Sequence, residues 1–126
     1  MNPVCLVLGA GAGIGGTVGK RFAKEGYHAV LCRRSDEEGL NALVSDIQAS
    51  SGEASGVLLN ALEDDTLEHL VANTEREIGP IEVVVFNLGA QIGDRRLQDT
   101  SRKAFELCWR LATFSLFRLA SAVCPF

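Results

Sequence analysis

The stretch LVLGAGAGIGG, residues 6–16, constrains this chain most, because it places glycines at 9, 11, 13, 15 and 16 directly behind a continuous apolar run. Such a run is typical of a strand buried on both faces of a sheet. Glycine has no Cβ, so the backbone after that strand can take a positive φ and bring its amides close to another group. The stretch predicts a strand, a tight turn and a helix N-terminus that receives a phosphate.

Two glycine registers compete in this stretch. Gly11, Gly13 and Gly16 fit GxGxxG, whereas Gly9, Gly13 and Gly15 fit GxxxGxG. Dinucleotide-binding loops place their first glycine at the end of the strand, which favours the second register because Gly9 directly follows Leu8. A tight turn or a close helix contact also explains glycines here. The predicted diphosphate contacts are Gly9, Gly11, Gly13, Ile14 and Gly15.

Apolar runs alternate with helical patterns along the chain. The runs cover residues 4–8, 29–32, 56–59 and 81–86. A first helix is predicted from Ile14, Val18 and Phe22, ending at Gly26, and a second opens with capping-box spacing between Ser35 and Glu38. A third begins near Asp64, with Asp64 and Asp65 as caps, and ends at Gly79-Pro80.

This alternation predicts the α/β class: a Rossmann-like, doubly wound parallel sheet in three αβα layers, with strand order 3-2-1-4. One domain is expected over residues 1–126. Residues 104–123 form a last helix that is apolar nearly all round and therefore needs cover on more than one side. Trp109, Phe114 and Phe117 are expected to cover the core or to make a subunit contact.

Composition excludes several classes of protein. Hydrophobic residues make up 47% and charged residues 22%, which argues against disorder. The start has no basic signal region, and Arg110 and Arg118 interrupt the longest apolar stretch, so no membrane association and a cytoplasmic location are expected. No basic stripe predicts nucleic-acid binding. Buried, reduced thiols without bound metal are expected at Cys5, Cys32, Cys108 and Cys124.

The chain resembles the first half of a short-chain dehydrogenase/reductase. LGAGAGIGGTVGKRFAKEGYHAVLCRR follows that family's TGxxxGIG loop, first helix and second strand, and GPIEVVVFNLGA resembles the segment ending in its NNAG motif. AFELCWRLATFSLFRLA resembles the helix that follows. The resemblance implies hydride transfer between a nicotinamide cofactor and a small carbonyl or alcohol.

Arg33 and Arg34 stand at the end of the second strand, where NAD-specific sites usually carry an acid. An arginine fork suits a 2′-phosphate, so the resemblance implies NADP(H) rather than NAD(H). In the alternative interpretation, one or both arginines pair with the acids at 36–38 on the surface.

The resemblance implies further cofactor contacts beyond the glycine loop. Asn60, followed by Ala61, stands where the family often has an acid that contacts adenine. Asn87 and Gly89 keep two letters of NNAG, with Phe86 and Leu88 in place of the others. Asn87 is expected to hold strand ends together and Gly89 to admit the ribose; a simple turn is the alternative for both.

No catalytic residue is predicted in this chain. The family's chemistry needs a serine and a Tyr-x-x-x-Lys pair, which the resemblance would place after Phe126, and Ala112 occupies the position of its helix asparagine. Tyr27 is expected to be a packing or surface residue, and His28 and His69 are expected on the surface or on a helix face.

Three hypotheses follow from these patterns. The first is the cofactor-binding half of an NADP(H)-dependent oxidoreductase, inactive by itself. The second is a non-catalytic dinucleotide-binding or regulatory module. In the third, the uncovered fourth strand and last helix act as an interaction surface, for example in a homo-oligomer.

Overall fold

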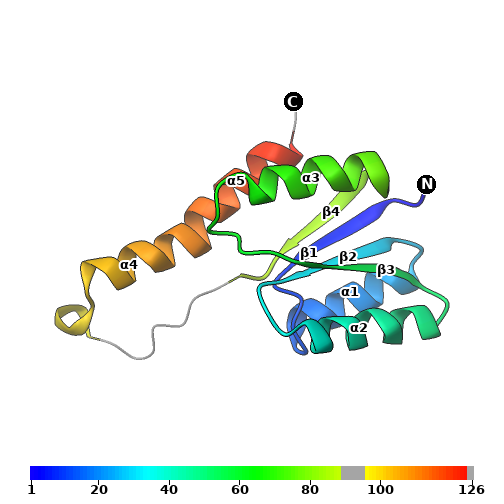
Figure 1. The fold of residues 1–126 in the computed structure, drawn as a ribbon, viewed down its shortest axis with the longest axis horizontal. Helices are drawn as coiled ribbons and strands as arrows, with labels where there is room; N and C mark the ends of the chain where they lie inside the picture. Colours follow the sequence, from blue (N-terminus) through cyan, green and yellow to red (C-terminus); the bar gives the residue numbers. More distant parts are fainter. Residues whose placement is uncertain (89–95, 125–126) are drawn as a thin grey trace.

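The computed structural model describes residues 1–88 and 96–124. Helices follow strands in strict alternation up to the fourth strand (Figure 1). The elements are β1 (Val4–Leu8), α1 (Ile14–Lys24), β2 (His28–Arg33), α2 (Glu37–Ala49), β3 (Glu53–Leu58), α3 (Thr66–Glu77), β4 (Ile81–Phe86), η1 (Leu97–Asp99), α4 (Arg102–Trp109), η2 (Arg110–Phe114) and α5 (Ser115–Val123).

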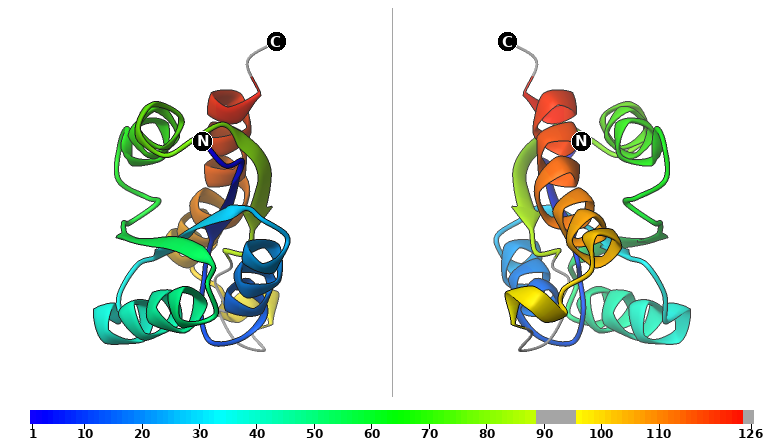
Figure 2. Two further views of the ribbon diagram at one scale, coloured as in Figure 1. Left: turned by 90° about the vertical axis from the view of Figure 1, so that its right-hand side faces the viewer. Right: turned by 90° about the vertical axis from the view of Figure 1, so that its left-hand side faces the viewer.

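The four strands form one parallel sheet in the order β3-β2-β1-β4, which confirms the predicted topology. Leu6 on the central strand β1 pairs in register with Val30 on β2 and with Val84 on β4. Helices α1 and α2 cover one face of the sheet, and α3 and α5 cover the other (Figures 1 and 2). The three predicted layers are therefore present.

The sheet separates two hydrophobic clusters. Every residue of β1 is buried, and alternate side chains pack toward α3 and α5 or toward α1 and α2. β3 lies at the edge of the sheet, where Leu58 is 43% exposed. The apolar run at residues 56–59 is therefore not buried on both faces, because helices cover an edge strand less completely than a central one.

The buried face of α1 differs from the prediction. Ile14 is 72% exposed, and Val18 and Phe22 are only partly buried. The buried positions are Gly15, Gly16, Gly19 and Ala23. A Cβ built on Gly19 would lie 2.6 Å from Cδ2 of Leu31 on β2, so the helix backbone packs closer to the sheet than a side chain would allow.

The helix caps follow the predicted spacing only in part. Gly26 has φ +93° after α1, as expected of a left-handed C-cap glycine. The predicted capping box at Ser35 is wrong, because α2 begins one residue later, where Asp36 accepts a hydrogen bond from the Gly39 amide at 3.1 Å. Asp65 occupies the N-cap of α3, but its side chain makes no capping bond. The Thr66 hydroxyl instead donates to the Asn60 and Glu63 carbonyls.

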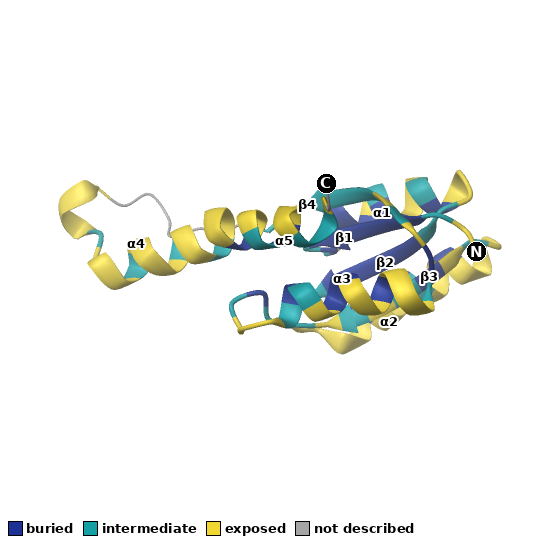
Figure 3. Ribbon diagram, turned by 90° about the horizontal axis from the view of Figure 1, so that it is seen from above, coloured by how far each residue is buried: buried dark blue, intermediate teal, exposed yellow. Residues whose placement is uncertain are grey.

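The predicted last helix is continuous but changes its winding. A π-helical turn, η2, separates α4 from α5, and the Ser115 hydroxyl donates to the Arg110 carbonyl across it at 2.8 Å. α4 projects beyond the sheet, and its residues are exposed or half-buried (Figures 1 and 3). Trp109 stacks on Phe114, and Phe114 on Phe117, with all three exposed. They do not cover the core, and a subunit contact, the other expectation for them, stays a prediction.

The cysteines, Tyr27 and His28 differ in how far they are buried. Cys5 and Cys32 are buried free thiols, and burial raises the pKa of Cys32 to about 12. Cys124 is exposed, contrary to prediction. Tyr27 packs edge-to-face on Phe22, as expected. His28 lies on β2, not on a helix face, and is half-buried; its Nε2 lies 2.7 Å from the Ser55 hydroxyl.

Substituting Gly19 tests the close packing of α1. We expect Gly19→Val to lower the free energy of unfolding by about 1–3 kcal/mol, because the added side chain meets Leu31 in a filled core. Lys24→Val is the matched control, since it puts the same β-branched residue on the exposed side of the same helix. Urea unfolding followed by circular dichroism measures both; equal losses would contradict the packing argument.

Candidate functional site

The carboxyl ends of β1, β2 and β4 meet at Gly9. Its φ of +84° is left-handed, and a Cβ there would overlap the carbonyl oxygen of Asn87. The amides of Gly9 and Ala10 both donate to the Cys32 carbonyl at 3.0 Å. Asn87 donates its amide to Leu8 O at 2.9 Å and its Nδ2 to Gly9 O at 3.2 Å. The expected linking of strand ends through Asn87 is therefore present.

Helix α1 begins directly against this junction. A Cβ on Gly15 would overlap the Gly9 carbonyl, and one on Gly16 would overlap the Gly11 carbonyl. Gly13, at the N-cap, has open space around it. Within the described part of the chain, the amides of residues 12–15 donate no hydrogen bond. Free donors at the positive end of a helix dipole suit an anion.

Arg33 lies between the glycine loop and the start of α2. Its side chain is only 18% exposed, and its Nη2 lies 3.4 Å from Asp36 Oδ2. It helps to line a cavity of about 230 Å³ together with Gly11, Ala12, Thr17 and Lys20. The cavity therefore presents one guanidinium that a carboxylate already partly neutralises. Pairing with an acid at 36–38, the alternative interpretation, is observed for Arg33.

A second, mostly apolar cavity of about 180 Å³ lies across the strand ends from the first. Asn60 and Ala61, predicted to contact the cofactor, both line it, and so does Arg34. Leu88 and Leu111 also line it and were missed by sequence reasoning. The only signal in the sequence is that Leu88 is a bulky residue within the altered NNAG motif. The remaining lining residues of this cavity are Leu8, Cys32, Arg33, Leu59 and Leu62.

The turn after β3 is held by bonds that sequence reasoning missed. Asn60 Oδ1 accepts the Leu62 amide at 3.0 Å. From α5, Arg118 donates to the carbonyls of Ala61 at 2.7 Å and Glu63 at 3.1 Å. Arg118 also binds both carboxylate oxygens of Glu68 on α3 at 3.0 Å. These bonds lower the pKa of Glu68 and raise that of Arg118.

Ile14, Gly89 and Ala112 are the other predicted positions. Ile14 starts α1 beside the loop with its side chain exposed. Gly89 lies outside the described residues. Ala112 is exposed within the π-helical turn η2 and brings no polar side chain to that position.

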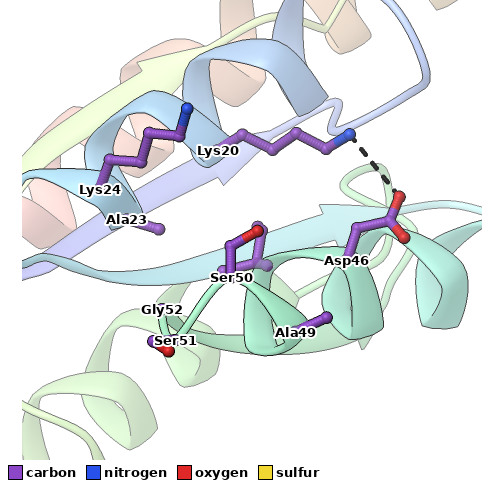
Figure 4. A pocket seen from close by; sticks show the side chains of 9 residues that line it. Lys20, Ala23, Lys24, Asp46, Ala49, Ser50, Ser51 and Gly52 are labelled. Carbon is purple, nitrogen blue, oxygen red and sulfur yellow. Dashed lines mark ion pairs between the residues drawn. The ribbon is translucent and has the colours of Figure 1, made fainter.

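A larger cavity, of about 550 Å³, lies between α1 and the C-terminal end of α2 (Figure 4). Lys20 and Asp46 line both this cavity and the one beside Gly11. Lys20 pairs with Asp46 at 3.7 Å, and Ser50 and Ser51 close one end of the larger cavity. The negative end of the α2 dipole points there, which disfavours phosphate. The glycine junction is therefore the better candidate for a nucleotide.

Residues 1–88 and 96–124 hold neither a candidate membrane-spanning helix nor a candidate metal cluster. None of the helices there combines the length and apolar character needed to cross a membrane. No group of three or more histidine, cysteine, aspartate or glutamate side chains there is arranged to hold a metal ion.

The family model for short chain dehydrogenases matches residues 3–126. The chain belongs to the short-chain dehydrogenase family. Members of this family bind a nicotinamide dinucleotide, and the junction described above lies in the strand order and loop position that such a fold provides.

Individual relatives agree with this assignment. Gluconate 5-dehydrogenase of Gluconobacter oxydans is 33% identical over 94% of this chain and 45% of its own length. The citronellol catabolism dehydrogenase of Pseudomonas aeruginosa is 30% identical, with a TM-score of 0.84 over 96% of this chain and 48% of that one. An actinorhodin polyketide ketoreductase structure with NADPH is 29% identical, with a TM-score of 0.86 over 96% and 46%. The chain spans less than half the length of each.

The Glu68–Arg118 pair gives the chain an acid-sensitive contact. Because the pKa of Glu68 is lowered on folding, its stabilising contribution is complete above the unfolded value of about 4.3 and is lost as pH falls through the folded pKa. We expect Glu68→Gln to be less stable than the parent chain at pH 7, with the difference shrinking below about pH 4. Urea unfolding at several pH values measures this. A pH-independent difference would contradict the role of the charge.

Proposed function

We propose that this chain is the cofactor-binding half of an NADP(H)-dependent short-chain oxidoreductase. The observation behind the proposal is the row of amides at residues 12–15, which donate no hydrogen bond to residues 1–88 or 96–124. The close contact between Gly9 and Gly15 holds these amides against the strand ends. Hydrogen-bond donors in that arrangement suit a diphosphate.

The residues present fit three parts of the dinucleotide: the diphosphate, the 2′-phosphate and the adenine. The open space at Gly13 leaves room for a diphosphate to approach the helix N-terminus. Arg33 would hold a 2′-phosphate beside Gly11, because its guanidinium lines the cavity there. Asn60, Ala61 and Leu111 would enclose the adenine in the apolar cavity.

The cofactor would supply or accept a hydride, and the substrate would be a small carbonyl or alcohol. This chain's own residues bind and orient: Asn87 fixes the strand ends, and the amides at the start of α1 hold negative charge. Proton transfer to the substrate oxygen requires an acid, and we assign none to this chain. The ketoreductase structure contains NADPH, and this relative therefore supports NADP(H) as the cofactor proposed for this chain.

A charge at the N-cap of α1 tests the diphosphate site. We expect Gly13→Asp to abolish measurable NADPH binding, because a carboxylate there would occupy and repel the diphosphate. The same carboxylate is a favourable helix cap, so the thermal midpoint should stay equal or rise. Isothermal titration calorimetry with NADPH measures the affinity.

Gly13→Asn is the matched control, since asparagine has the same size and capping ability without the charge. We expect it to retain clearly more affinity than Gly13→Asp. Equal affinities for NADPH in the parent chain and Gly13→Asp would place the diphosphate elsewhere. No heat with the parent chain would overturn the proposed function itself.

Cofactor preference is tested at the end of β2. We expect Arg33→Gln to weaken NADPH about tenfold or more while leaving NADH nearly unchanged, because a charge-assisted bond to the 2′-phosphate contributes about 1.5–3 kcal/mol. Arg34→Gln should have the smaller effect, since Arg34 lines only the apolar cavity. The ratio of the two dissociation constants is the measurement, and an unchanged ratio in Arg33→Gln would contradict the assignment.

A non-catalytic nucleotide-binding module is the second candidate function. The exposed Ala112 in η2 favours it, because the family's helix asparagine, which holds a water in the proton relay, is replaced by a methyl group. Both candidates expect residues 1–126 alone to bind NADPH without reducing a carbonyl. They differ only in a longer form of the protein, where NADPH binding without NADPH-dependent carbonyl reduction would support this candidate over an oxidoreductase.

A further inference from the structure

The turn after β3 forms one wall of the apolar cavity at the strand ends. Asn60, Ala61 and Leu62 are contiguous in sequence and all line it. This turn has no strand partner of its own, because β3 ends at Leu58 and α3 begins only at Thr66. Its shape therefore depends on hydrogen bonds to its carbonyls and amides.

Arg118 supplies the long-range part of that support. Its Nη1 donates to the Ala61 carbonyl at 2.7 Å, and its Nη2 donates to the Glu63 carbonyl at 3.1 Å. Its side chain is only 14% exposed. One guanidinium thus holds the turn at two points from the far side of the cavity wall.

Glu68 fixes the guanidinium itself. Nε and Nη2 of Arg118 each lie 3.0 Å from one carboxylate oxygen, which is the bidentate geometry that arginine alone can make. The plane and direction of the guanidinium are therefore set by α3. Lysine could replace the charge but could not bind two carbonyls and a carboxylate in one plane.

The helix that carries Arg118 also contributes a lining residue to the cavity. Leu111 in η2 lines it, and the helix continues without a break into α5, which carries Arg118. The turn and Leu111 are thus tied to one continuous helix. A displacement of α5 would therefore alter the space in which a base would lie.

We propose that Arg118 is a positioning residue for the adenosine end of the cofactor. It acts through the Asn60–Glu63 turn, whose carbonyls it holds, and does not touch the ligand. The inference rests on the proposed function, since it assigns the apolar cavity to the adenine. Without this role, the hydrogen bonds of Arg118 would serve only to join α5 to α3 and to the turn.

Binding of 2′,5′-ADP to the full 126-residue chain tests the inference, because this probe carries the adenine and 2′-phosphate without the nicotinamide half. We expect Arg118→Met to raise its dissociation constant about tenfold, which corresponds to about 1.4 kcal/mol. Amide hydrogen exchange should accelerate at Leu62 and Glu63, whose amides close the turn onto Asn60.

Ile47→Ala is the control for a merely structural role. Ile47 is 4% exposed in the cluster on the other face of the sheet, so its truncation lowers stability without contact to the turn. Measured at a temperature where both variants are folded, Ile47→Ala should bind 2′,5′-ADP within about twofold of the parent chain. Arg118→Lys should be more stable than Arg118→Met but should bind 2′,5′-ADP as weakly. If Arg118→Met does not fold, Arg118→Lys is the variant measured in its place.

The outcomes separate the two proposals. If the parent chain binds 2′,5′-ADP and the arginine variant binds it equally well, the positioning role is overturned and the proposed function stands. Faster exchange at the turn with unchanged affinity has the same meaning. If the parent chain does not bind the probe, the proposed function is overturned and the inference with it.

Discussion

The structure depends on the close approach of backbones where β1 turns into α1. Asn87 O leaves no room for a side chain on Gly9, and Gly9 O leaves none on Gly15. These contacts bring the helix N-terminus against the carboxyl ends of the central strands. A side chain at either position would move α1 outward and separate its free amides from Arg33 and from the strand ends. The glycines thus position the site before any ligand contact is considered.

The same constraint explains why hydrophobic periodicity misassigned the buried face of α1. Ile14, Val18 and Phe22 recur with helical spacing, and such a pattern normally marks the core side. Here the helix lies so close to β1 and β2 that only small residues fit beneath it, and Gly19 rests directly on Leu31. Apolar spacing identifies a core face only when side chains, rather than backbone atoms, fill the interface.

Local signals in the sequence predicted much of the fold. The strand order and the parallel pairing follow from apolar runs that alternate with helical patterns. The bond between Asn87 and the end of β1 was implied by the resemblance to the NNAG motif. The cap of α2 was displaced by one residue, because Ser35 and Asp36 are both good capping residues and spacing alone does not separate them. The exposure of α4 depends on which neighbours are present, which no local pattern encodes.

The contacts of Arg118 were missed for a different reason. Glu68 and the turn at Ala61 lie far from Arg118 in sequence, and charge pairing across such a distance has no periodicity. The one signal that the sequence offers is an arginine within an apolar helix. A largely buried arginine requires an acid or a carbonyl as its partner, but only the folded topology determines which one lies opposite it.

The pairing of Arg33 with Asp36 bears on how a phosphate would enter. Asp36 uses one carboxylate oxygen to cap α2 at Gly39 and presents the other to Arg33. The Asp36 side chain is 59% exposed and lies at the positive end of the α2 dipole. If the Arg33 guanidinium leaves it, the carboxylate still accepts from the Gly39 amide and is hydrated by solvent. A 2′-phosphate carries more charge and more acceptor oxygens than the carboxylate. We therefore expect Asp36 to hold Arg33 beside Gly11 in the absence of ligand, and a 2′-phosphate to replace the carboxylate as the partner of Arg33.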